Sequence, residues 1–259
     1  MNWLFEPTAF RENQHLEDVI RHQGHNCYIV KYSPFSKTQD LPDLDSPTLF
    51  YGSLNLGLHV KKKSYVPGIW CDLEKFKCST YYPYFDLLNK PYSIFPAGDY
   101  YNLRTSLFNW FGINSDIFLR PNSGFKIFTG GLINELESME HFLGGQKIFE
   151  NDLLLASRPA KIKREWRLVV CDKRVIASSK YIENGLLDTE EGCPEEVIQF
   201  ANQQIQNWQP ELCFVIDICE SDRLSVLELN SFSCSGFYAC NLKEIVYWAS
   251  LAAQKELDV

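Results

Sequence analysis

Two aliphatic runs near the C-terminus are the feature that most limits how this chain can fold. Leu212–Cys219 and Leu224–Asn230 both favour β-strands, and the short polar segment between them favours a hairpin. Residues two apart on a strand face the same side, so Glu228 and Asn230 project together. Asp217 lies in the middle of the first strand. The hairpin is therefore expected to bring two carboxylates and an amide together within an otherwise apolar sheet.

This set of oxygen donors predicts a metal site. Buried carboxylates rarely lack partners, and Mg²⁺ binds few protein oxygens while it keeps water and substrate phosphates. We therefore expect Asp217, Glu228 and Asn230 to hold magnesium. The plainer alternative is that they are surface groups on two ordinary strands.

A basic pair lies earlier in the chain, in the segment IFLRPNSGFKIFTGG. Its pattern predicts a strand, a tight turn and a second strand, with Arg120 and Lys126 on either side of the turn. Backbone amides in such a loop, together with fixed cations, can cradle phosphate oxygens. A surface hairpin with two solvated charges is the alternative.

A second basic stretch is SRPAKIKREWR, residues 157–167. Strand alternation places Lys161, Lys163, Glu165 and Arg167 on one face. Three cations and one carboxylate suit an anionic ligand that also carries hydroxyl groups. A charged edge strand that discourages sheet pairing would give the same pattern.

Composition excludes several classes of protein. The 259 residues carry a formal net charge of −8, which argues against a nucleic-acid partner because phosphate binding needs a basic surface. The sequence has neither the roughly 20-residue apolar stretch of a membrane span nor a signal-peptide pattern. Nine cysteines form neither a Cys-x-x-Cys pair nor a zinc pattern. We therefore expect reduced thiols, a cytoplasmic location and no membrane partner.

The N-terminal part predicts a small doubly wound α/β layer. Residues 64–112 are rich in aromatic residues and are expected to form irregular connections and short helices. The first layer is expected to consist of strands Asn2–Phe5, Cys27–Val30 and Thr48–Tyr51, with a helix over Glu12–His22. Later elements are expected to be a helix over Leu132–Leu143, a strand over Asp152–Ala156, a hairpin of Ile162–Val170 and Arg174–Ser178, and helices over Pro194–Trp208 and Leu242–Lys255.

The order of these motifs resembles the ATP-grasp superfamily over roughly residues 115–245. IFLRPNSGFKIFTG is similar to the family's phosphate-loop hairpin, DLLLASRP to its adenine strand, and VIDIC followed by VLELN to its paired metal strands. The nearest resemblance is to a bacterial and phage branch in which Arg-Pro replaces the usual Lys-Pro. The resemblance implies an α+β ATP-grasp fold: an N-terminal α/β domain over residues 1–112, then two α+β subdomains clasping ATP over residues 113–259.

The resemblance also implies roles for individual residues. Two features depart from the family: the adenine strand lacks an acidic residue, and the loop after Lys126 is less glycine-rich. ATP would be bound by Arg120, Lys126, Lys161, Lys163, Glu165 and the backbone around Leu154, Ala156 and Ser157; Arg167 and Lys180 would be catalytic; Asp217, Glu228 and Asn230 would bind Mg²⁺; and Ser233, Ser235 and Gly236 would line the substrate loop.

The implied activity is a magnesium- and ATP-dependent ligase that joins a carboxylate to an amine through an acylphosphate. Its substrates would be small molecules or peptides, which the sequence does not identify, and the oligomeric state is equally open. Two alternatives are a small-molecule kinase on the same fold and a catalytically inactive ATP-binding or interaction protein.

Overall fold

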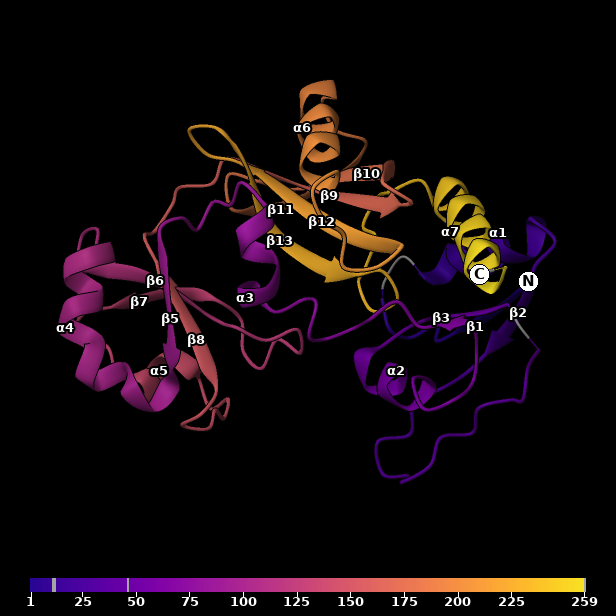
Figure 1. Ribbon diagram of the computed structural model, residues 1–259, viewed down its shortest axis with the longest axis horizontal. Helices are drawn as coiled ribbons and strands as arrows, with labels where there is room; N and C mark the ends of the chain where they lie inside the picture. The colour runs from indigo at the N-terminus through magenta and orange to yellow at the C-terminus, as the bar shows by residue number, and fades with distance from the viewer. Residues whose placement is uncertain (11–12, 46, 259) are drawn as a thin grey trace. The chain divides into compact units, whose positions relative to one another are not determined.

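A computed structural model of the protein describes residues 1–10, 13–45 and 47–258 (Figure 1). The chain forms two compact units, the first made of Met1–Asp72 with Ile162–Val259 and the second of Leu73–Lys161. The expected domain boundary at residues 112/113 lies inside the second unit. That boundary stays a prediction, because compactness does not test where a nucleotide-binding domain begins.

The N-terminal part of the first unit is a parallel sheet of order β2-β1-β3-β4. Its strands are β1 (Asn2–Phe5), β2 (Asn26–Ile29), β3 (Thr48–Tyr51) and β4 (Pro67–Gly68), and its helices are α1 (Asn13–His22) and α2 (Leu54–Val60). Parallel strands need a crossover, which α1 and α2 supply. α1 packs beside the C-terminal helix α7 (Leu242–Leu257), as Figure 1 shows. Trp3 and Phe5 share one core with Ile245 and Ala249.

The rest of the first unit is a five-stranded antiparallel sheet of order β11-β10-β9-β12-β13. The hairpins follow the sequence, but β9 also pairs with β12, which joins the two hairpins into one sheet. Its elements are β9 (Arg164–Cys171), β10 (Arg174–Glu183), β11 (Leu186–Glu191), α6 (Glu195–Ile205), β12 (Cys213–Glu220) and β13 (Leu224–Ser231). Cys171 and Cys213 are register partners on β9 and β12 and form a disulfide, so the expectation that all thiols are reduced is wrong for this pair.

The second unit is an antiparallel sheet of order β5-β8-β6-β7. Its core lies on one face, where Leu107 and Phe111 of α4 pack with Leu119 and Ile133 of the sheet. The elements are α3 (Cys78–Tyr81), η1 (Tyr82–Tyr84), β5 (Tyr92–Pro96), η2 (Ala97–Asp99), α4 (Tyr100–Phe111), β6 (Asp116–Pro121), β7 (Gly131–Asn134), α5 (Met139–Leu143) and β8 (Leu153–Ser157).

Two local predictions in this unit are wrong. The strand expected directly after the 121–124 turn is a loop, and β7 begins only at Gly131, because Lys126 takes a φ of 50° that interrupts an extended chain. The helix expected over Leu132–Leu143 is β7 followed by the short α5. Ser138 starts α5 by accepting a hydrogen bond from the amide of His141. The sequence also did not predict β5, β11 or the full length of α4.

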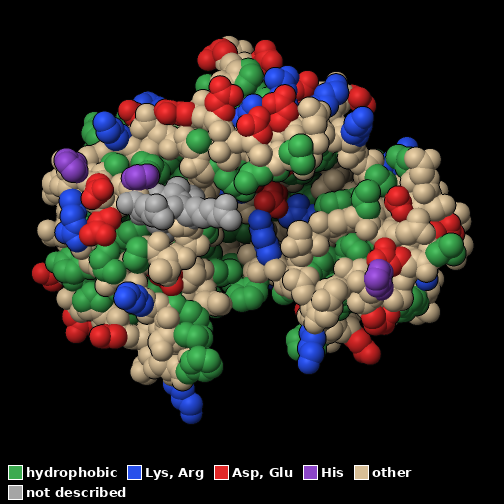
Figure 2. Space-filling view, turned by 180° about the vertical axis from the view of Figure 1, so that it is seen from behind, with side chains coloured by type: hydrophobic (Ala, Val, Ile, Leu, Met, Phe, Trp, Pro, Cys, Tyr) green, Lys and Arg blue, Asp and Glu red, His purple; other side chains and the backbone are tan. Residues whose placement is uncertain are grey.

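Charged side chains of both signs are interspersed on the face shown in Figure 2. That mixture agrees with the acidic net charge of the chain. Among the described residues no helix is long and apolar enough to cross a membrane.

Candidate functional site

The predicted metal residues lie together on β12 and β13. Asp217 and Glu228 are register partners, and the side-chain amide of Asn230 donates to Asp217 Oδ2 and to Glu228 Oε1, both at 3.0 Å. Asp217 is fully buried. Two carboxylates and an amide therefore converge, as the strand alternation predicted.

Arg167 joins this group from the neighbouring strand β9. Its Nε donates to Asp217 Oδ1 at 2.9 Å and its Nη2 to Asp217 Oδ2 at 2.7 Å, a bidentate pair. Burial works to lower the pKa of Arg167, but the adjacent Asp217 carboxylate outweighs it and raises the pKa. The guanidinium therefore stays charged and offsets one of the buried carboxylates.

Glu165, the predicted ribose ligand, lies on the same face of β9 as Arg167. Tyr181 Oη donates to Glu165 Oε2 at 2.5 Å. Burial raises the pKa of Glu165; the Tyr181 hydrogen bond opposes this rise, and the nearby Asp217 and Glu228 carboxylates add to it. Burial also raises the pKa of Tyr181 well above its usual value, and Asp217 and Glu165 add to that shift. Tyr181 therefore remains a hydrogen-bond donor that holds Glu165 in place.

The chemistry of this donor set fits a magnesium ion. Asn230 uses its nitrogen for both carboxylates, so its Oδ1 oxygen is the atom it could offer to a cation. Within the described residues no three His, Cys, Asp or Glu side chains are arranged to hold a metal by themselves. A cation here would need further ligands, which is how Mg²⁺ binds when substrate phosphates and water complete its shell.

The structure does not bring Lys180 to this group. Lys180 is the register partner of Trp166, whereas Ser179 is the partner of Arg167. Neighbouring residues on a strand face opposite sides, so Lys180 lies on the face opposite Arg167. Its ammonium pairs with Glu183, Asp188 and Glu190 at 2.8, 2.9 and 3.4 Å.

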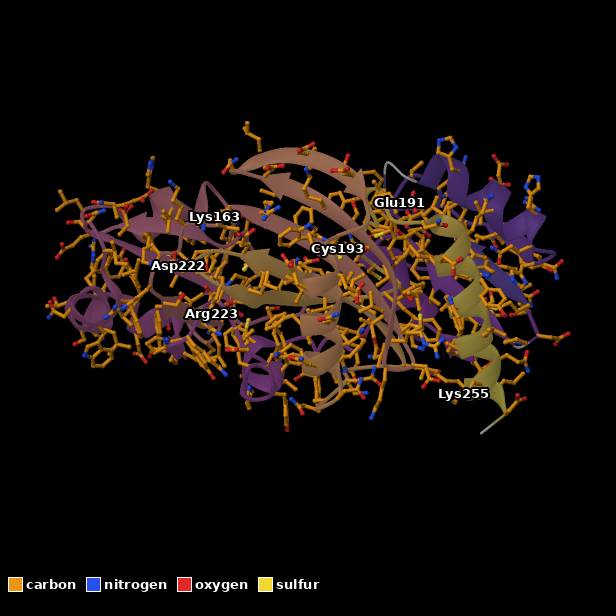
Figure 3. All side chains as sticks on the ribbon, turned by 90° about the horizontal axis from the view of Figure 1, so that it is seen from above. Lys163, Glu191, Cys193, Asp222, Arg223 and Lys255 are labelled. Atoms are coloured by element: carbon orange, nitrogen blue, oxygen red, sulfur yellow. A yellow bond between two sulfur atoms is a disulfide. The ribbon has the colours of Figure 1, made fainter. Side chains whose placement is uncertain are left out.

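Lys163 is exposed, and it lies just before β9. Its backbone amide donates to the Glu220 carbonyl at 2.8 Å. Figure 3 shows Lys163 at the same end of the sheet as Asp222 and Arg223, which occupy the turn between β12 and β13. Lys163 thus shares a strand end, rather than the Asp217 group, with further charges.

The expected substrate loop follows β13 and is anchored within the first unit. Ser233 Oγ accepts a hydrogen bond from the Trp70 amide at 3.0 Å, and the Ser233 carbonyl accepts one from the Gly52 amide at 2.9 Å. The carbonyl of Ser235 accepts a hydrogen bond from Tyr51 Oη at 2.9 Å. Ser233 is fully buried, so its hydroxyl holds the loop to the N-terminal layer.

The predicted nucleotide residues of the second unit divide between the two faces of its sheet. Leu154 and Ala156 pack into the core, whereas Ser157 and Arg120 belong to the other face, because Ser157 pairs with Phe118 and Arg120 with Leu155. β8 lies between β5 and β6, so its backbone serves both ladders. This arrangement disfavours adenine contacts by the backbone of Leu154 and Ala156.

Ser157 is the polar side chain on that second face with an unmet hydrogen bond. Its Oγ is fully buried and has no hydrogen-bond partner among the described residues. Leaving a buried hydroxyl unpaired costs about 1–3 kcal/mol. Such an orphaned group is expected where a ligand supplies the partner.

The loop 122–130 carries the other predicted phosphate cation. Lys126 is exposed in this loop, and Lys161 is exposed at the end of the second unit. The loop packs closely at Gly124, where a Cβ atom would lie 2.4 Å from the Leu73 carbonyl oxygen. A side chain at position 124 would therefore displace the loop.

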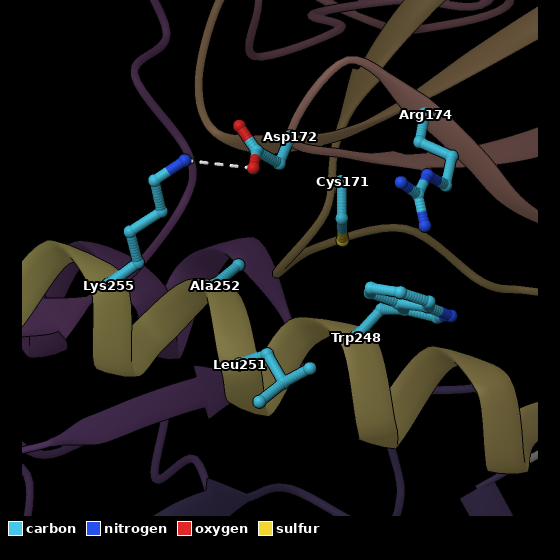
Figure 4. Close-up of a pocket in the computed structure, with 7 residues that line it drawn as sticks. All are labelled: Cys171, Asp172, Arg174, Trp248, Leu251, Ala252 and Lys255. Atoms are coloured by element: carbon cyan, nitrogen blue, oxygen red, sulfur yellow. Dashed lines mark hydrogen bonds and ion pairs between the residues drawn. The ribbon is translucent and has the colours of Figure 1, made fainter.

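A separate pocket of about 210 Å³ lies at the β9–β10 turn against α7 (Figure 4). Lys255 pairs with Asp172 at 2.8 Å on its rim, and Arg174 lies 4.8 Å from the ring centroid of Trp248. The lining residues are Cys171, Asp172, Arg174, Trp248, Leu251, Ala252 and Lys255. None of the predicted site residues contributes to it.

Sequence reasoning missed Tyr181 and Tyr238. Their rings stack with centroids 4.6 Å apart at an interplanar angle of 3°, beside the Arg167 guanidinium. Tyr181 follows Lys180 at a β-bulge in β10. The sequence offers no local signal for that bulge, so the pairing was not predictable.

The geometry can now be compared with known proteins. Residues 103–247, more than half of the chain, match a family described as an ATP-grasp domain, the second family of its clade. The chain belongs to this ATP-grasp family. No curated protein sequence matches the chain.

Solved ATP-grasp structures share the fold along nearly the whole length. An ATP-grasp RimK domain protein from Sphaerobacter thermophilus covers 99% of this chain and 100% of its own, at 13% identity and a TM-score of 0.61. D-cycloserine synthetase covers 98% and 99%, at 9% identity and a TM-score of 0.61. A RiPP-associated ligase from Chryseobacterium gregarium, in complex with ADP and a leader and core peptide, covers 98% and 96%, at 10% identity and a TM-score of 0.61. The predicted α+β ATP-grasp fold is confirmed.

Proposed function

We propose that the protein is a magnesium- and ATP-dependent ligase that joins a carboxylate to an amine through an acylphosphate. The observation that carries the proposal is the group formed by Asp217, Glu228 and Asn230 in a chain of the ATP-grasp family. Buried carboxylates are costly unless something uses them. A bound magnesium nucleotide would supply the phosphoryl group and neutralise the charge that develops on it.

The residues of the first unit have distinct parts in this proposal. Asp217, Glu228 and the Asn230 amide oxygen would hold the cation. Glu165, kept in position by Tyr181, would accept hydrogen bonds from the ribose hydroxyls. Fixed groups of this kind accelerate a reaction by positioning and by charge neutralisation, without a side-chain nucleophile.

The second unit would bind the nucleotide through one face of its sheet. Arg120 would neutralise phosphate charge, and the unsatisfied Ser157 hydroxyl would gain a partner. Lys126, Lys161 and Lys163 are exposed cations that we assign to the phosphates. The Arg120-Pro121 pair is the feature on which the comparison with the Arg-Pro branch rests.

We propose a small molecule or a peptide as the substrate. Two structural neighbours illustrate the range, one being named a D-cycloserine synthetase and the other a ligase in complex with a leader and core peptide. The loop with Ser233, Ser235 and Gly236 would border the acceptor. We also propose a cytoplasmic location, where millimolar Mg·ATP is present.

Product analysis tests this function. Wild type and the Asp217→Asn variant would be incubated with Mg·ATP and panels of carboxylates and amines, with Glu220→Gln on the same strand as the matched control. A ligase produces ADP, free phosphate and an amide; a kinase produces ADP and a phosphorylated product without free phosphate. Nucleotide binding without turnover across the panels would identify an inactive ATP-binding protein.

A further inference from the structure

The loop after β13 is tied to the Asp217 group through one side chain. Arg167 Nη1 donates to the Gly236 carbonyl at 2.8 Å while its Nε and Nη2 hold both oxygens of Asp217. Arg167 is 8% exposed. Three of its five N–H groups are thus committed within the protein, and a single guanidinium spans the metal strand and the substrate loop.

The same guanidinium is flanked by two aromatic rings. Its Cζ lies 4.9 Å from the ring centroid of Tyr238 and 5.6 Å from that of Tyr181, within the range of cation–π attraction. Tyr181 also holds Glu165. The stack therefore connects the loop residue Tyr238 to a second predicted nucleotide contact.

The backbone of Tyr238 shows that these contacts hold the loop in one conformation. Its φ is 51°, in the left-handed region that bulky residues rarely adopt. Such a conformation persists only when the surrounding structure determines it. The stack on Tyr181, the Arg167 contact and the hydrogen bond from the Ala239 amide to Ser179 Oγ at 3.2 Å provide that constraint.

We infer that Arg167 and Tyr238 are positioning residues that lock the loop 231–238 to Asp217, so that the acceptor loop and the cation site are set together. This inference rests on the proposed function for its catalytic consequence and replaces the expected contact of Arg167 with the transferred phosphate. Because one side chain serves both sites, binding at one would strengthen binding at the other, and the effect must be reciprocal.

Hydrogen exchange of the nucleotide-free protein tests the lock without depending on activity. Arg167→Lys keeps the charge but loses the bidentate geometry, and Tyr238→Leu removes the ring while it leaves Asp217 paired. Arg164→Lys is the matched control, because Arg164 also pairs with a β12 glutamate, Glu220, and lies 5.2 Å from a ring centroid, that of Trp166. Arg164 shares the Trp166 face of β9, opposite Arg167.

We expect amide exchange across residues 232–240 to rise by about tenfold in Arg167→Lys and Tyr238→Leu, the effect of losing one charged hydrogen bond or ring contact. The control should match wild type in this segment. Unchanged exchange in both variants, with an intact circular dichroism spectrum, would overturn the lock.

Calorimetry with ATP and ADP then separates positioning from phosphate contact. A positioning role predicts that Arg167→Lys weakens both nucleotides about equally in Mg²⁺ and neither without it. A direct contact with the transferred phosphate predicts a loss for ATP alone, with no change in loop exchange, and would overturn the inference. Absence of nucleotide binding in wild type would contradict the proposed function and leave the exchange result to decide the lock.

Discussion

Asp217 and Glu228 are directly opposite each other on β12 and β13, and the Asn230 amide donates a hydrogen bond to each of their carboxylates. Like charges directly across an antiparallel pair destabilise a sheet. The amide and the Arg167 guanidinium offset this repulsion from two sides. The arrangement keeps two acidic groups close together in a largely apolar layer, which is what a cation site needs.

Replacing Asn230 by Leu should destabilise the protein. The variant removes both donors from the two carboxylates, and unpaired buried acceptors cost about 1–3 kcal/mol. Urea unfolding at neutral pH should show a fall of that size in the free energy of unfolding. Asn26→Leu is the control, since the Asn26 amide bonds only to the exposed Asn2 side chain, and its effect should stay within about 0.5 kcal/mol. A loss no larger than the control's would contradict the role of the amide.

Ser157→Ala should leave the apo protein as stable as wild type but weaken nucleotide binding. The Ser157 hydroxyl has no partner to lose among the described residues, whereas a ligand would satisfy it. Thermal unfolding and ATP titration measure the two effects. Ser179→Ala is the opposite case, because the Ser179 hydroxyl donates to the Lys180 carbonyl and accepts from Ala239. That variant should lose about 1 kcal/mol of stability. Equal ATP affinity in wild type and Ser157→Ala would refute the nucleotide contact.

Lys180→Met should change nucleotide affinity little. The strand register places Lys180 on the face opposite Arg167, with three carboxylates around its ammonium. If Lys180 held the phosphoryl group, as the sequence suggested, the same variant would abolish turnover. Steady-state kinetics with the identified substrates distinguishes the two, and a loss of only a few-fold supports the register.

Cys27 should make stability fall with alkaline pH. Burial raises the pKa of its thiol to about 11, above the usual value of 9.0. A raised folded-state pKa contributes stability that is present below the unfolded pKa and is lost as pH rises through the folded one. Relative to Cys27→Ala, wild type should therefore lose up to about 1.4 kcal/mol per pH unit between those values. Urea unfolding at pH 8 and pH 10 measures the difference, and a pH-independent difference would contradict it.

The sequence predicts what depends on neighbouring residues along the chain. The strands of the Asp217 hairpin follow from aliphatic runs around a short polar turn, and the convergence of Glu228 with Asn230 follows from alternation. The match of residues 103–247 to the ATP-grasp family confirms the resemblance on which the fold was predicted.

What the sequence could not predict depends on lateral pairing and on single backbone angles. Arg167 meets Asp217 because β9 pairs with β12, a contact between strands that belong to different hairpins. The bulge after Lys180 decides where Tyr181 points. The apolar residues after Gly124 resemble a strand, but the positive φ of Lys126 makes a loop of them.

The measurement that tests the central claim most directly is calorimetric titration of ATP, with and without Mg²⁺, into wild type and Glu228→Gln. Glu220→Gln serves as the control, since Glu220 pairs with Arg164 away from Asp217. The account predicts magnesium-dependent binding in wild type and in the control, and a weakening of about tenfold or more in Glu228→Gln from the loss of a charged ligand. Wild type that binds no nucleotide under either condition, or Glu228→Gln that binds as tightly as wild type, would contradict it.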